Sequence, residues 1–116
     1  QIPYGFLKHQ VLLCDESIKS VSSSEAHVRV LTSDLFKGRV ERAEDRLQKL
    51  ISAMRSENWK SSFEICWNEF WDMHTLFHTS SPSFMYMNAS TMKALLMLHK
   101  NWSEKGDGPL VTMDAG

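Results

Sequence analysis

The sequence has little cysteine, no excess of basic charge and no long apolar run. Its only two cysteines, Cys14 and Cys66, lie far apart. They fit reduced buried thiols of a cytoplasmic protein, with one long-range disulfide as the alternative. Lysine and arginine number 13 against 14 acidic residues, a formal net charge of −1, so charge favours neither nucleic acid nor an anionic membrane as a partner. The apolar runs are too short for a membrane span, and residues 1–10 lack the pattern of a secretory signal.

Motifs for metal or nucleotide binding are also missing. The sequence contains no HExxH, no CxxC and no Walker-type glycine loop. His74 and His78 have the spacing of two metal ligands on one helix turn, but such pairs are more typical of surface or capping residues, so no metal site is predicted. The serines at 22–24 could offer a phosphate their hydroxyls and N–H groups, or simply serve as loop and cap residues.

What the 116 residues do contain is helical periodicity, with 42% hydrophobic and 23% charged residues. This composition fits one domain or part of one. Thr32 and Ser33 are good N-caps for a helix over about 34–56. Its opposite face, with Arg42, Glu44, Asp45 and Lys49, is expected to be solvated. The expected apolar stripe of this helix is formed by Phe36, Val40, Ala43, Leu47, Leu50 and Met54.

Two further helices are predicted over about 58–77 and from Asn88 or Ser90 to about 103. The first of these has apolar side chains over a wide arc, which indicates core packing, with a ligand groove as the alternative. Asn88 is a candidate cap of the second. A short helix could also run from the serines at 22–24 through Val28. The residues expected to be buried in the last helix are Met92, Leu95, Leu96 and either His99 or Trp102.

Two apolar runs, Gln10 to Cys14 and Leu110 to Met113, are short and bounded by polar residues, which indicates strands. The order strand, helices, strand predicts an α+β domain whose helices pack on one face of a small antiparallel sheet. Two short strands make a poor sheet. Either further strands lie outside this chain, or the protein is mostly a helical bundle.

Asp114 follows the last predicted strand. An aspartate before Ala-Gly is ordinary in a turn. Alternatively, a strand end projects the carboxylate into a cleft, where it orients a substrate hydroxyl or takes its proton.

Three stretches, in order, resemble mevalonate diphosphate decarboxylase of the GHMP kinase superfamily. They are "VSSSEAHVRVLTSDLF" (21–36), "MHTLFHTSSPSFMYMNAST" (73–91) and "VTMDAG" (111–116), the last similar to the start of an Asp-Ala-Gly-Pro-Asn segment. The resemblance covers about residues 10–116. The chain departs from the family at Ala26-His27, where Gly-Met is usual, and at Ser83, where a second proline is common.

The resemblance implies a GHMP-kinase-like C-terminal domain, ferredoxin-like but incomplete, with residues 1–116 as a single partial domain and the N-terminal ATP-binding domain absent. It implies a cytoplasmic, ATP-dependent decarboxylation of mevalonate 5-diphosphate to isopentenyl diphosphate, in which Asp114 is catalytic and Asp114, Ala115 and Gly116 contact substrate. ATP and Mg²⁺ would be bound mainly by the absent part. The fragment alone would be inactive, its own N-terminal domain would be its partner, and a homodimer is one assembly the family adopts.

Two alternatives stay open. A sister enzyme, a phosphomevalonate decarboxylase or a mevalonate kinase, shares the scaffold. A small helical interaction module, docking through its tryptophan-rich helix, is the alternative outside enzymes.

Overall fold

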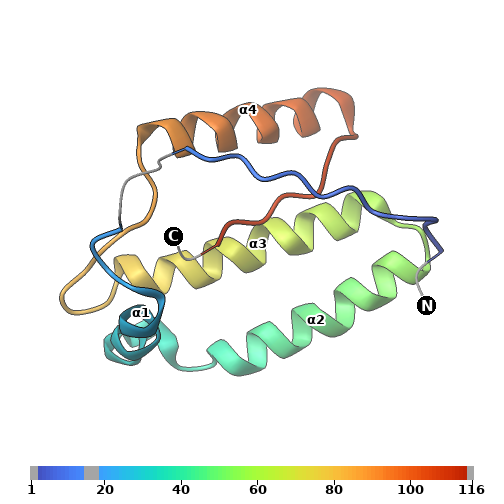
Figure 1. Ribbon diagram of the computed structural model, residues 1–116. Coiled ribbons are helices and arrows are strands. Elements are labelled where there is room, and N and C mark those ends of the chain that lie inside the picture. Colours follow the sequence, from blue (N-terminus) through green and yellow to red (C-terminus); the bar gives the residue numbers. More distant parts are fainter. Residues whose placement is uncertain (1–2, 15–18, 115–116) are drawn as a thin grey trace.

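The computed structural model describes residues 3–14 and 19–114, and helices dominate it. Figure 1 shows α3 in the middle, with α2 along one side, α4 along the other and α1 at the C-terminal end of α3. Extended segments before α1 and after α4 run beside α3 and α4. The helices are α1 (Ser23–Arg29), α2 (Arg39–Arg55), α3 (Trp59–His78) and α4 (Ala89–Lys105), with 3₁₀ turns at Val30–Thr32 and Asp34–Phe36.

Local signals set the ends of these helices. Ser22, Asn58 and Asn88 are the N-caps of α1, α3 and α4, and each side chain accepts a hydrogen bond from the backbone N–H three residues further on. The prediction that Asn88 caps a helix is therefore confirmed. Helix α4 ends at Gly106, whose φ of 65° lies in the left-handed region that glycine adopts without steric cost.

The predicted antiparallel sheet is wrong. Within residues 3–14 and 19–114 no strand is present, and both predicted strands are extended segments without a backbone ladder. The apolar run before α1 misled because it is not buried: Leu13 is 73% exposed, and Val11 and Leu12 are also exposed. An apolar run alone does not distinguish a buried strand from an exposed one. The α+β assignment is thus replaced by its alternative, a mainly helical domain.

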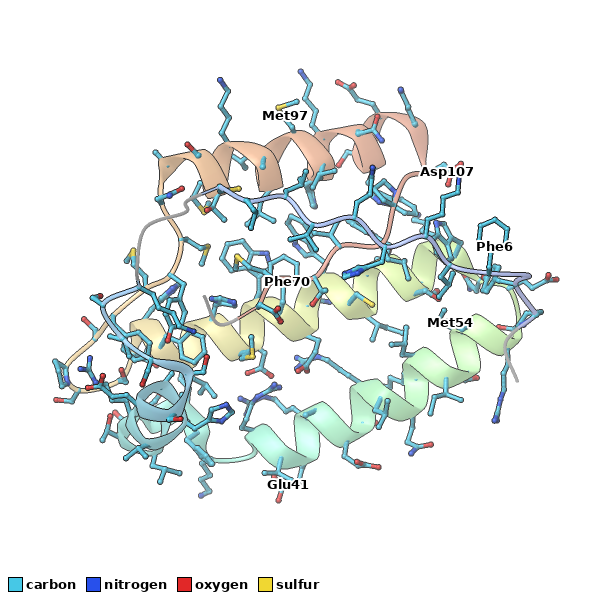
Figure 2. The ribbon with its side chains drawn as sticks, viewed as in Figure 1. Phe6, Glu41, Met54, Phe70, Met97 and Asp107 are labelled. Atoms are coloured by element: carbon cyan, nitrogen blue, oxygen red, sulfur yellow. The ribbon has the colours of Figure 1, made fainter. Side chains whose placement is uncertain are left out.

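The main core lies where α3, α4 and the C-terminal segment meet. Phe70 projects from α3 into the space between α3 and α4 (Figure 2). Trp59, Trp67 and Trp71 are half-buried and pack against this cluster, which favours core packing over a ligand groove. The fully buried members of the cluster are Phe63, Phe70, Leu95, Trp102 and Val111.

Helix α4 buries only part of the predicted set. Leu95 and Trp102 are buried, whereas His99 is exposed and Leu96 is 64% exposed. Met92 is also exposed. Because α4 contacts the rest of the protein along a narrow stripe, its methionines and leucines next to that stripe remain in solvent, as Met97 does in Figure 2.

Helix α2 differs from its prediction in start and in orientation. The continuous helix over 34–56 is interrupted, since Gly38 has a φ of 81° and the α-helix starts only at Arg39. Two members of the expected apolar stripe, Val40 and Leu47, are 68% and 49% exposed. The predicted solvated face is confirmed for Glu44, Asp45 and Lys49, which are exposed, but is wrong for Arg42, which is half-buried and forms an ion pair with Asp72 of α3.

Three arginines of α2 pair with two carboxylates of α3. Arg39 makes a bidentate contact with Glu69 (Nη1–Oε1 2.9 Å, Nη2–Oε2 2.5 Å), and Arg42 makes one with Asp72 (Nε–Oδ2 2.8 Å, Nη2–Oδ1 2.8 Å). Arg46 reaches both acids. The Asp72 side chain is only 9% exposed, and Arg42, then Arg46 and Arg39, hold the pKa of its carboxyl well below the usual range. Charge pairing thus replaces apolar contact where the first half of α2 lies against the second half of α3.

The C-terminal segment is held by side chains instead of a sheet. The indole Nε1 of Trp59 donates to the carbonyl of Gly108, and that of Trp102 donates to the carbonyl of Pro109, both at 2.7 Å. Further along, Nε2 of His74 lies 3.2 Å from the carbonyl of Met113. These ring N–H groups satisfy backbone acceptors that a neighbouring strand would otherwise satisfy.

We expect Gly108→Ala to destabilise the protein by about 1–3 kcal/mol, the usual cost of overpacking. An added Cβ would lie 2.9 Å from Nε1 of Trp102 and 3.2 Å from Nδ2 of Asn101, so the indole and the segment must separate. Urea denaturation followed by tryptophan fluorescence measures the change. The matched control is Gly5→Ala, where nothing lies within 4 Å of the added Cβ. A stability of Gly108→Ala equal to that of the control would contradict this prediction.

Cys14 and Cys66 are both free and half-buried, so the disulfide alternative is not realised. In the part of the chain that the structure describes, no helix combines the length and apolar character needed to cross a bilayer.

Candidate functional site

Asp114 is the last described residue of the C-terminal segment. Val111 is buried, Thr112 exposed, Met113 half-buried and Asp114 exposed. This alternation is that of an extended chain with one face on the helices. It directs the carboxylate of Asp114 to the solvent side. Ala115 and Gly116, the other two predicted substrate contacts, lie outside the described residues.

The Asp114 carboxylate accepts no hydrogen bond from any residue in 3–14 or 19–114. It therefore does not cap a described helix. A shallow hollow elsewhere on the surface is lined by Gln48, Ile51, Ser52, Arg55 and Ser56. None of these belongs to the C-terminal segment or to α3, so this hollow is not part of the Asp114 surface.

His74 lies directly beneath the end of the segment. Its side chain is fully buried, and the Phe77 and Tyr86 rings make T-shaped contacts with it, with ring centroids at 5.0 and 6.4 Å. Burial lowers the pKa of His74, and the hydrogen bond to the Met113 backbone opposes this shift. Because a carbonyl only accepts hydrogen bonds, Nε2 of the neutral ring carries the proton. The other nitrogen, Nδ1, is buried without a partner among the described residues.

The three stretches that carry the family resemblance meet around the C-terminal end of α3. Four contacts between groups far apart in sequence link them, all between side chains, or between a side chain and backbone. These are Tyr86 Oη to the carbonyl of Val21 (2.8 Å), the Ser81 N–H to Oγ1 of Thr32 (2.8 Å), Ser33 Oγ with Thr79 Oγ1 (2.5 Å), and His74 Nε2 with the carbonyl of Met113 (3.2 Å). One connected set of contacts thus links the start of α1, the loop after α3 and the segment that bears Asp114.

The serine cluster has local uses. The Ser22 hydroxyl accepts from the Glu25 N–H at 3.1 Å as the cap of α1, and Nζ of Lys19 donates to Oγ of Ser23 at 2.7 Å. The capping alternative is therefore confirmed for Ser22.

His74 and His78 do not form a metal centre with other groups. Over residues 3–14 and 19–114, no three or more His, Cys, Asp or Glu side chains gather as metal ligands. Burial lowers the pKa of both histidines. The expectation that such a pair lies at the surface is wrong for His74. Helical spacing alone does not show which side of a helix is covered by other residues.

The fold matches solved decarboxylase structures. A mevalonate diphosphate decarboxylase from Legionella pneumophila matches with a TM-score of 0.93 and 45% identity, covering 100% of this chain and 37% of that one. The enzyme from Enterococcus faecalis matches with a TM-score of 0.73 and 26% identity, over 82% of this chain and 30% of that one. A structure described as MDDEF in complex with MVAPP, AMPPCP and magnesium gives 0.77 and 26%, over 88% and 31%. The architecture is thus that of a C-terminal decarboxylase domain.

The family model described as "Mevalonate 5-diphosphate decarboxylase C-terminal domain" matches residues 10–116. The chain therefore belongs to the mevalonate 5-diphosphate decarboxylase C-terminal domain family, which confirms the resemblance seen in the sequence. It spans 37% of the length of the Legionella enzyme. A comparison with curated protein sequences gave no match.

Proposed function

We propose that this chain is the C-terminal part of a cytoplasmic, ATP-dependent diphosphomevalonate decarboxylase, which converts mevalonate 5-diphosphate to isopentenyl diphosphate, carbon dioxide, ADP and phosphate. The 45% identity over the whole chain to a mevalonate diphosphate decarboxylase supports this function. Because the chain covers about a third of that enzyme, we further propose that a preceding N-terminal part supplies the rest of the active site.

The observation that carries the proposal is the exposed Asp114 carboxylate, which accepts no hydrogen bond from the described residues and lies at the end of a tethered segment. A carboxylate within hydrogen-bond reach of the substrate's tertiary hydroxyl would orient it and accept its proton. It would also stabilise positive charge that develops on the neighbouring carbon. Ala115 and Gly116 would contact the substrate through the adjoining backbone.

ATP and Mg²⁺ are assigned to the N-terminal part. The described residues offer no cluster of metal ligands and no glycine-rich phosphate loop, so they do not fit a magnesium–nucleotide site. When bound, ATP supplies the phosphoryl group that makes the tertiary hydroxyl a leaving group. The relative whose structure is described with AMPPCP and magnesium is consistent with this assignment.

The test is to express the full-length protein that contains this chain and to assay it with three substrates in parallel. We expect ADP formation and release of carbon dioxide with mevalonate 5-diphosphate, and little of either with mevalonate 5-phosphate or mevalonate. Carbon dioxide release with mevalonate 5-phosphate, and not with the other two substrates, would instead assign the sister decarboxylase. ADP formation from mevalonate without carbon dioxide would assign the kinase.

A further inference from the structure

We propose that His74 is the positioning residue of this active site: its Nε2–H donates to the Met113 carbonyl and so fixes the peptide that leads into Asp114. The inference rests on the proposed decarboxylase function. It assigns a role to a buried side chain that does not itself touch the substrate.

The geometry favours this role because the segment has three side-chain tethers and only one lies near the carboxylate. The two indoles hold Gly108 and Pro109, six and five residues before Asp114. His74 holds Met113, the residue immediately before it. Without His74, the side-chain hydrogen bond nearest to Asp114 would be the one at Pro109, five residues earlier, and small displacements of a catalytic group are costly.

The surroundings of His74 keep its ring in one orientation. It is fully buried, with Phe77 from its own helix and Tyr86 from the following loop in T-shaped contact with it. A ring packed in this way cannot rotate to another partner without opening the core. Nδ1 has no partner among the described residues, and burying an acceptor without a donor is unfavourable. The hydrogen bond that Nε2 makes explains why a polar ring nevertheless occupies this position.

The groups that face this ring lie on three elements. Burial is the largest influence on the pKa of His74 and lowers it, as does His78 one turn further along α3, whereas the backbone of Met113 and the backbone and charge of Asp114 raise it. Tyr86 faces the ring from the loop. A protonated imidazole would still donate through Nε2, but the neutral form is the one that this environment favours.

The test compares three variants of the full-length enzyme. His74→Phe keeps the ring shape and removes the donor; we expect kcat to fall about a hundred-fold with little change in KM. His74→Gln places an amide N–H near the position of Nε2 and should recover most of the loss. His78→Phe is the matched control, because His78 is on the same helix but makes no hydrogen bond to the segment, and its kcat should stay near wild type.

An unchanged kcat in His74→Phe would overturn the proposal. So would a kcat in His74→Gln as low as in His74→Phe, since packing alone would then explain the loss. A second readout does not depend on turnover. Long-range ¹⁵N–¹H correlation spectra of the wild-type protein should show His74 with its proton on Nε2, and the Nδ1–H tautomer would overturn the proposal even if the enzyme were inactive on mevalonate 5-diphosphate. Absence of turnover with the expected Nε2–H tautomer would count against the proposed function, not against the hydrogen bond.

Discussion

Replacing Asp114 by asparagine in the full-length enzyme is expected to lower kcat by about a hundred- to ten-thousand-fold, the usual loss on removing a general base. Asparagine has nearly the same shape but cannot accept the proton of the substrate hydroxyl. Its neutral amide also offers no negative charge to a developing cationic centre. ATP binding should stay close to wild type, because the nucleotide is assigned to the N-terminal part. Steady-state kinetics and calorimetric titration with ATP measure the two quantities.

The matched control is Thr112→Ala, two residues earlier on the same exposed side of the segment. It changes a polar side chain without removing a charge, so kcat should remain within about two-fold of wild type. Wild-type kcat in Asp114→Asn would remove the carboxylate from the mechanism. An equal loss in both variants would show that the segment, not the carboxylate, is what the enzyme requires.

The helices were the predictable part of the fold. Apolar spacing located α3 and α4 to within two residues at each end, because their buried faces are apolar and their caps are typical. Periodicity was only partly right for α2: it located the end of the helix, but half of the face toward α3 carries arginines. A scale that scores arginine as solvated cannot anticipate a helix whose charged face is covered by acids from another helix.

The strands were wrong for a different reason. Leu110 to Met113 has the length and composition of a strand, and the segment is indeed extended and partly buried. The carbonyl of Met113, however, bonds to His74, and those of Gly108 and Pro109, just before the run, bond to Trp59 and Trp102. Those donors are up to 49 residues away in sequence, so no local pattern could reveal them.

The sequence proposed residues for the candidate site but could not show the contacts that surround them. Resemblance singled out Asp114, and the match to the family confirms the resemblance, while the catalytic role of Asp114 stays a prediction. His74 was considered only as a metal ligand or a surface residue. Its burial and its contact with Met113 depend on how the C-terminal segment crosses α3, which only the three-dimensional structure shows.

Asp72→Asn is expected to destabilise the protein by about 1–3 kcal/mol, between the values for an exposed and a buried ion pair, because the Asp72 side chain is 9% exposed and that of Arg42 38%. The variant leaves Arg42 without its bidentate acceptor and removes one of two acceptors from Arg46. Helix α2 has little to compensate, since Ala53 is its only residue classed as buried. Hydrogen exchange should therefore show faster exchange throughout α2, with much less change in α4.

The control for this variant is Asp45→Asn, which breaks the exposed Asp45–Lys49 pair, with side chains 61% and 65% exposed; surface pairs of this kind contribute at most about 1 kcal/mol. The pH dependence separates the two cases further. The pKa of Asp72 is lowered in the folded state, so its stabilisation is present above pH about 4 and is lost as the pH falls below that value. The free energy of unfolding should then fall more between pH 5 and about 2 in the wild type and in Asp45→Asn than in Asp72→Asn. Equal slopes in all three proteins would mean that the Asp72 carboxylate does not hold α2 against α3.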